Sequence, residues 1–139
     1  MGTVTSLIRA TTDELDHLRT HTHDIEGILW DPERRGAPSG YLDKSVDELQ
    51  TLLDTAGVVV NLAPQTMPGE MINHNGTFFL LYPNTIATMA EALTATTRDT
   101  IADHADSSTS HYVMANYDNL TAFTADAAAR GLGAVMSHN

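Results

Sequence analysis

Apolar residues recur at helical spacing in several separate stretches of the chain. The clearest case is Leu120, Phe123 and Ala127, followed by Gly131, and the spacing places these residues on one face of a helix. The same periodicity, with the flanking polar residues, predicts six helices, near residues 11–18, 24–30, 45–56, 83–93, 98–105 and 117–130.

Helix ends are marked by residues with known capping chemistry. Thr11-Thr-Asp-Glu14 and Ser45-Val-Asp-Glu48 both have the spacing of a capping box, in which a hydroxyl and a glutamate satisfy free amides. Pro83 suits the first position of a helix. Gly57 and Gly131 are each placed to end one, because glycine reaches the left-handed conformation at little cost.

Four short apolar stretches lie between these helices and predict strands. They are residues 3–9, the β-branched run 58–60, residues 77–81 after the turn-forming Asn75-Gly76 pair, and residues 132–136. The order has no regular alternation of strand and helix. We therefore expect a single α+β domain over residues 1–139, with a small mixed β-sheet packed against several helices.

One hydrophobic core is expected to unite these elements. Its predicted members come from two helices of the second half, one helix of the first half and two of the strands. They are Leu49, Leu52, Val59, Phe79, Ile86, Leu120 and Phe123.

Several segments resemble the bacterial YfbM-like family, known as domain of unknown function 1877. The final helix has Leu120-x-x-Phe123, an Ala-rich turn, Gly131 and a closing strand, as in that family, and the Met-Gly opening strand before an acidic-capped helix is also similar. The Asp43-Lys44 helix with its paired leucine and the strand–Pro83–helix junction agree as well, whereas Val46 stands where the family often has tryptophan. The resemblance implies an α+β fold and carries no established activity.

Composition is that of an ordinary folded chain, with 42% hydrophobic and 18% charged residues in 139. No apolar run approaches the roughly 20 residues that span a bilayer, and no basic segment followed by a long apolar stretch suggests a secretory signal. The absence of cysteine excludes disulfides and thiol catalysis. We expect a cytoplasmic protein, without membrane association.

Charge is strongly negative, since 18 acidic residues face 7 basic ones and give a net charge of −11. A negative field repels phosphate backbones, so nucleic-acid binding is disfavoured. The same field favours association with a basic protein partner. Many acidic proteins, however, carry such charge only for solubility.

Seven histidines suggest metal binding, but their surroundings argue against a specific site. His17 and His21 lie four residues apart, and His23 and Asp24 follow. The predicted helix directs His17 away from its apolar stripe, toward solvent, where a metal would lack a supporting shell. Neither a nucleophile elbow nor a phosphate-binding glycine loop is present. We therefore expect no catalytic residues, no metal site and no cofactor.

The remaining candidate is the segment around the loop 31–40, where Trp30 and Tyr41 flank Arg34 and Arg35. Aromatic residues beside arginines are typical of protein interfaces. Alternatively, Trp30 plugs the end of its helix and the arginines pair with Asp31 and Glu33. The sequence favours a non-enzymatic, cytoplasmic protein-binding module, with a phage- or toxin-related role as one form. The alternative is a small-molecule-binding protein or enzyme with a pocket between sheet and helices.

Overall fold

The computed structural model describes residues 4–64, 66–105 and 110–138. The elements follow in the order β1 (Thr5–Ala10), α1 (Thr12–Thr20), the 3₁₀ turn η1 (Thr22–Asp24), α2 (Ile25–Leu29), β2 (Tyr41–Asp43), α3 (Val46–Thr55), β3 (Glu70–Asn73), β4 (Thr77–Leu81), α4 (Pro83–Thr94), α5 (Arg98–Asp103), α6 (Ser110–Ala129) and β5 (Gly133–His138). All six predicted helices are confirmed. Thr3, the predicted start of the first strand, lies outside the described residues.

Five strands form one sheet in the order β2-β1-β5-β4-β3, and the first and last strands of the chain are neighbours. All four strand pairings are antiparallel. The α+β class is confirmed, but the sheet is antiparallel throughout the described strands, where a mixed sheet was expected. Among the described residues, no helix is both long enough and apolar enough to cross a bilayer.

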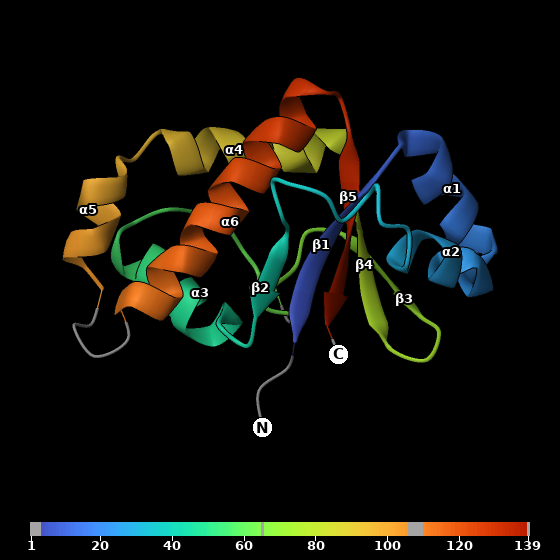
Figure 1. Ribbon diagram of the computed structural model, residues 1–139, viewed down its shortest axis with the longest axis horizontal. Coiled ribbons are helices and arrows are strands. Elements are labelled where there is room, and N and C mark those ends of the chain that lie inside the picture. Colours follow the sequence, from blue (N-terminus) through green and yellow to red (C-terminus); the bar gives the residue numbers. More distant parts are fainter. Residues whose placement is uncertain (1–3, 65, 106–109, 139) are drawn as a thin grey trace.

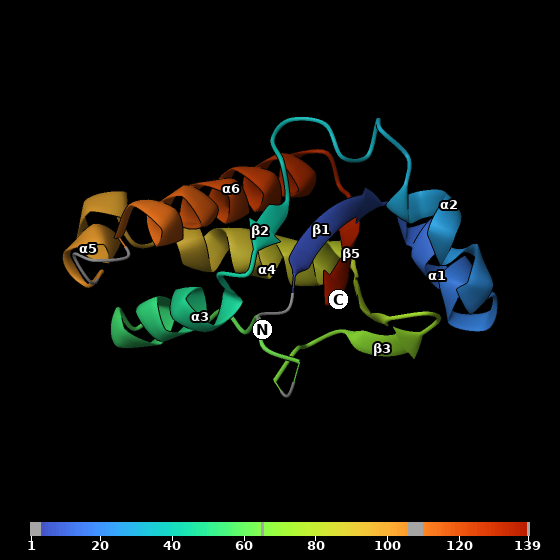
Figure 2. The same ribbon diagram turned by 60° about the horizontal axis from the view of Figure 1, so that its bottom comes forward.

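Helices cover both faces of this sheet (Figure 1). Alternate side chains of the strands point to opposite faces, so Leu7, Phe79 and Met136 join one hydrophobic cluster while Ile8, Phe78 and Val135 join another. The first cluster includes side chains of α3, α4, α5 and α6, and the second includes side chains of α1 and α2. Figure 2 shows α4 and α6 lying side by side along one face, with α1 and α2 at the other side of the sheet.

Six of the seven predicted core residues lie in the first cluster. Val59 is the exception, because its side chain is 82% exposed. The run Val58–Val60 belongs to no strand, and the Val60 amide donates to the carbonyl of Val58. The Gln50 side chain takes the place of a neighbouring strand, since its amide donates to the carbonyl of Val60 and accepts from the amide of Leu62. The prediction of a buried strand here is wrong.

Two further local predictions differ from the structure. Thr11 and Glu14 form the expected capping box, but Ser45 does not cap α3, because its hydroxyl donates to the carbonyl of Leu42. The hairpin between β3 and β4 is confirmed. Its turn, however, places three residues between the paired Asn73 and Thr77, where the Asn-Gly pair suggested a two-residue turn.

Candidate functional site

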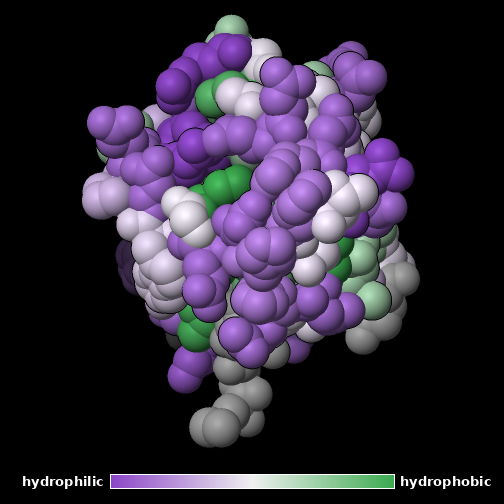
Figure 3. Space-filling model, turned by 90° about the vertical axis from the view of Figure 1, so that its right-hand side faces the viewer, coloured by the Kyte–Doolittle hydropathy of each residue, from purple (hydrophilic) through white to green (hydrophobic). Residues whose placement is uncertain are grey.

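The helices α1 and α2 enclose a groove of about 400 Å³ on the outer side of the sheet. Its lining combines apolar, acidic and basic side chains from both helices and from the loop after α2. These residues are Asp13, Glu14, His17, Leu18, Asp24, Gly27, Ile28 and Arg34. The surrounding face is largely hydrophilic, with a few hydrophobic residues visible between the polar ones (Figure 3).

One side of the groove carries a histidine–carboxylate pair. His17 Nε2 lies 2.6 Å from Asp24 Oδ2, and His23 Nε2 lies 3.3 Å from Asp24 Oδ1. The hydrogen bond with His17 lowers the pKa of Asp24, so this carboxylate is ionised at neutral pH. The rings of His17 and His21 are stacked, with centroids 4.3 Å apart.

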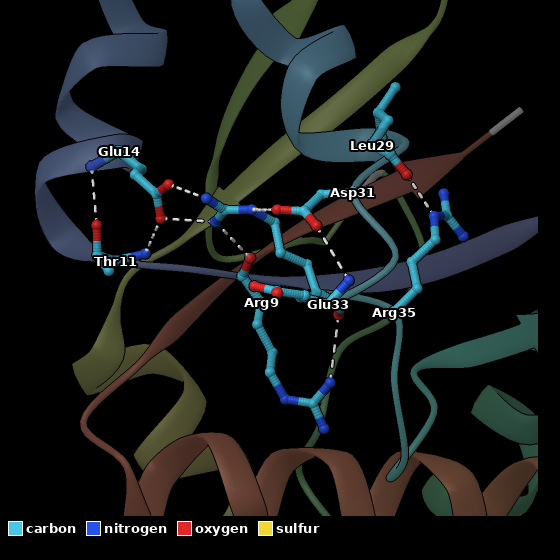
Figure 4. A network of polar contacts seen from close by, with 8 residues as sticks. Arg9, Thr11, Glu14, Leu29, Asp31, Glu33 and Arg35 are labelled. Carbon is cyan, nitrogen blue, oxygen red and sulfur yellow. Dashed lines mark hydrogen bonds and ion pairs between the residues drawn. The ribbon is translucent and has the colours of Figure 1, made fainter.

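The other side is closed by Arg34, whose guanidinium binds both carboxylate oxygens of Glu14 and one of Asp31 (Figure 4). The Arg34 hydrogen bonds are the largest cause that holds the pKa of Glu14 at about 2. Glu14 also accepts from the Thr11 amide. The capping box of α1 and the loop after α2 are therefore joined through one carboxylate.

Arg9 holds the loop 31–40 through three hydrogen bonds to its backbone carbonyls. This residue was not identified from the sequence. Its side chain starts on β1, is only 5% exposed, and donates to Asp126 of α6 and to the carbonyls of Arg34, Gly36 and Pro38. Its guanidinium carbon lies 4.7 Å from the centre of the Phe123 ring. The only signal in the sequence was an arginine at the end of the first predicted strand, residues 3–9.

Trp30 follows the last residue of α2 as its C-cap and is 73% exposed. Arg35 folds back onto it, because its Nε donates to the carbonyl of Leu29 and its guanidinium carbon lies 5.5 Å from the ring centre. Trp30 therefore does not plug the helix end. The expected pairing of an arginine with Asp31 is made by Arg34.

Tyr41 lies apart from these residues. It belongs to β2 at the edge of the sheet, where its carbonyl accepts from Asn119 of α6 and its hydroxyl lies 3.3 Å from an Asp43 oxygen. The four candidate residues thus divide into Trp30, Arg34 and Arg35 around the end of α2 and Tyr41 on another element. The loop 31–40 connects the two places.

The histidine cluster predicted to lack a specific metal site is brought together around Asp24. His17 faces solvent, as expected from the helix periodicity, with its side chain 50% exposed. In the part of the chain that the structure describes, no group of three or more histidine, aspartate or glutamate side chains has the geometry of a metal site. The prediction concerning metal itself remains to be tested.

Other hollows lie elsewhere on the molecule. One of about 390 Å³ lies between α3, the end of α5 and α6, and includes Asp47, Glu48, Thr51 and Thr55. Another, of about 640 Å³, lies between α1 and the edge strand β3, where Arg19 pairs with Glu70. Both hollows lie at the surface. The space between the sheet and the helices is filled by side chains of the two hydrophobic clusters.

Comparison with known proteins gives a family and a similar structure. The family model described as a domain of unknown function (DUF1877) matches residues 1–137. The crystal structure of YfbM from Escherichia coli, a protein of unknown function, is similar with a TM-score of 0.64 and 13% identity, over 98% of this chain and 99% of that chain. No curated protein matches this chain. At this identity the structural match concerns the fold alone.

Proposed function

This chain belongs to the DUF1877 family, and we propose that it is a non-enzymatic, cytoplasmic protein-binding module whose docking face lies on α1 and α2. The observation that carries the proposal is the exposure of Trp30, the only tryptophan. Tryptophan is among the residues that most often dominate the energy of protein interfaces. A phage- or toxin-neutralising role is one form of this function.

Contacts around Trp30 suit an interface residue. Arg35 covers part of the indole and is itself fixed by the carbonyl of Leu29. This contact restricts the side chains in the unbound protein, and a restricted side chain loses less entropy when a partner binds. Trp30 also follows α2 directly, and α2 lines the groove, so a partner that packs on the indole can reach the groove as well.

Electrostatics favour a basic partner. The arginines at 9, 19, 34, 98 and 130 are each paired with a carboxylate of the chain itself. On either side of Trp30 in the chain, Glu26 and Glu33 form no ion pair with the residues that the structure describes. Arg35, which lies over the indole, is the one arginine of the described residues without an ion pair, and the two free glutamates outnumber it. This small negative excess, within a chain of net charge −11, favours the encounter with a basic partner.

Affinity capture from the native host tests the proposal. Wild-type protein, Trp30→Ala and Val59→Ala serve as baits, since Val59 is a second exposed hydrophobic residue on another part of the surface. We expect a basic protein to be retained by wild type and by Val59→Ala but lost with Trp30→Ala. Equal capture by all three baits, or no capture above background, would overturn the proposal.

The second candidate is small-molecule binding, favoured by the hollow between α3, α5 and α6. Its lining offers two hydroxyls, from Thr51 and Thr55, together with the carboxylates of Asp47 and Glu48. Such a site suits a small cation or amine. A thermal melt against amines, nucleotides, sugars and metals tests this candidate, and a shift lost on Thr51→Val would place a ligand there.

A further inference from the structure

The groove between α1 and α2 has an apolar floor, and its walls carry three carboxylates together with His17 and with Arg34, which is paired with Glu14. Leu18 and Ile28 form its floor and are almost wholly buried. Asp13 and Asp24 line it from α1 and from the turn before α2. This combination is complementary to a lysine or arginine side chain, which has an aliphatic stem and a positively charged head.

Gly27 leaves the space above α2 open. A Cβ atom added at this position would meet no atom within 4 Å, and its backbone does not adopt a positive φ angle that would require glycine. Glycine inside a helix costs roughly 0.5–1 kcal/mol relative to alanine. The five-residue helix α2 therefore carries a glycine that neither packing nor backbone geometry demands, at the position where a side chain would enter the groove.

The carboxylates of the groove differ in how far their own chain satisfies them. Glu14 is bound by Arg34 through both oxygens. Within the described residues, the Asp13 carboxylate has no hydrogen bond or ion pair, and the Asp24 carboxylate contacts only imidazoles. A carboxylate has about four acceptor positions, so both aspartates retain free ones for a cationic group.

We propose that this groove receives one lysine or arginine side chain of the basic partner. The stem lies over Leu18 and Ile28, and the charged head lies between Asp13 and Asp24. Gly27 provides the room for the stem. The inference rests on the proposed function and names the chemistry that the docking face recognises.

Titration with short peptides followed by NMR tests the groove without the partner. The probes are acetylated and amidated Gly-Arg-Gly, Gly-Lys-Gly and Gly-Gln-Gly, and the signals are the Gly27 amide and the methyl groups of Leu18 and Ile28. We expect saturable shifts with the first two peptides, with Kd values on the order of 1–10 mM for a single side chain. The glutamine peptide is expected to cause none.

Two pairs of variants separate the groove from general effects. Asp24→Asn and Gly27→Leu should weaken binding of the arginine peptide by at least about fivefold, through lost charge and through filled space. Their controls are Asp99→Asn on α5 and Ala87→Leu on the exposed side of α4, which should bind as wild type does. Should Gly27→Leu fail to fold, the Asp24→Asn comparison still decides.

The inference is overturned if the glutamine peptide binds as well as the arginine peptide, or if Asp24→Asn binds as tightly as Asp99→Asn. Its failure is distinct from failure of the proposed function. Loss of partner capture with Trp30→Ala, together with no peptide binding, would retain the docking face and reject the groove. Peptide binding with unchanged capture by Trp30→Ala would retain the groove and reject the tryptophan as anchor.

Discussion

At the scale of single residues, burial determines how much a substitution lowers the free energy of unfolding. Phe123 of α6 is fully buried and lies beneath the Arg9 guanidinium, whereas Val59 is almost fully exposed. Both are large apolar residues, and both were expected in the core. Their different surroundings give opposite expectations for the same kind of substitution.

Phe123→Ala is expected to lower the free energy of unfolding by about 3–5 kcal/mol, because it removes buried apolar surface and leaves a cavity. Val59→Ala should change it by less than about 0.5 kcal/mol. Urea denaturation of the two variants beside wild type measures the difference. A Phe123→Ala protein as stable as wild type would show that the position of α6 described above is incorrect.

Glu14 predicts a pH dependence with a definite sign. Its pKa is lowered from 4.5 to about 2, first by the Arg34 hydrogen bond. The stabilisation is therefore fully present above about pH 5 and is lost as the pH falls from 4.5 toward 2. Because the carboxylate is partly exposed, we expect roughly 1–2 kcal/mol at pH 7, below the value that the shift alone would give.

The measurement is the difference in unfolding free energy between wild type and Glu14→Gln, from pH 7 down to pH 2. This difference should shrink steadily below pH 4.5. Asp13→Asn, which removes a neighbouring carboxylate without an ion pair among the described residues, is the matched control for the loss of one negative charge on α1. A constant difference across the range would contradict the role given to Glu14.

At the scale of elements, Arg9 fixes the loop 31–40 between β1 and α6. Arg9→Ala would leave three carbonyls and the Asp126 carboxylate without this donor, so we expect a loss of about 3–5 kcal/mol, as for other broken buried ion pairs. Amide hydrogen exchange should rise across the loop. Arg19→Ala removes an exposed pair with Glu70 and should cost less than about 1 kcal/mol. Equal effects of the two variants would refute this assignment.

For the histidines at the junction of α1, η1 and α2, we expect no specific binding of zinc. His17, His21, His23 and Asp24 lie close together but are largely exposed, and the imidazoles already contact the carboxylate or one another. Metal analysis of protein purified without a histidine tag should find less than roughly a tenth of an equivalent of zinc. One equivalent, lost on His21→Ala, would establish a metal site and favour a metal-dependent activity.

At the scale of the whole molecule, the net charge of −11 predicts that the protein does not bind DNA. A fluorescent DNA duplex at 0.15 M salt should show no change in anisotropy up to about 100 μM protein, since nonspecific binding depends on cations that neutralise phosphates. Five of the six arginines are already paired with carboxylates of the chain. Binding that weakens steeply with salt would contradict this expectation.

Local signals in the sequence determined much of the architecture. Helical periodicity located all six helices, the Thr11–Glu14 spacing gave a real capping box, and Gly131, with a φ of 67°, ends the last helix before β5. These features depend on residues within a few positions of one another. The amino-acid sequence is therefore sufficient to predict them.

Only the tertiary structure decided features that depend on distant partners. The place of β5 between β1 and β4 and the burial of Arg9 under the loop join residues far apart in the chain. The contact of the Gln50 side chain with Val60 is likewise invisible in the local hydrophobic pattern. The separation of Tyr41 from Trp30 and the groove kept open by Gly27 belong to the same class. Hydrophobic pattern specifies which face of an element is buried, but it does not specify which distant backbone or side chain meets that face.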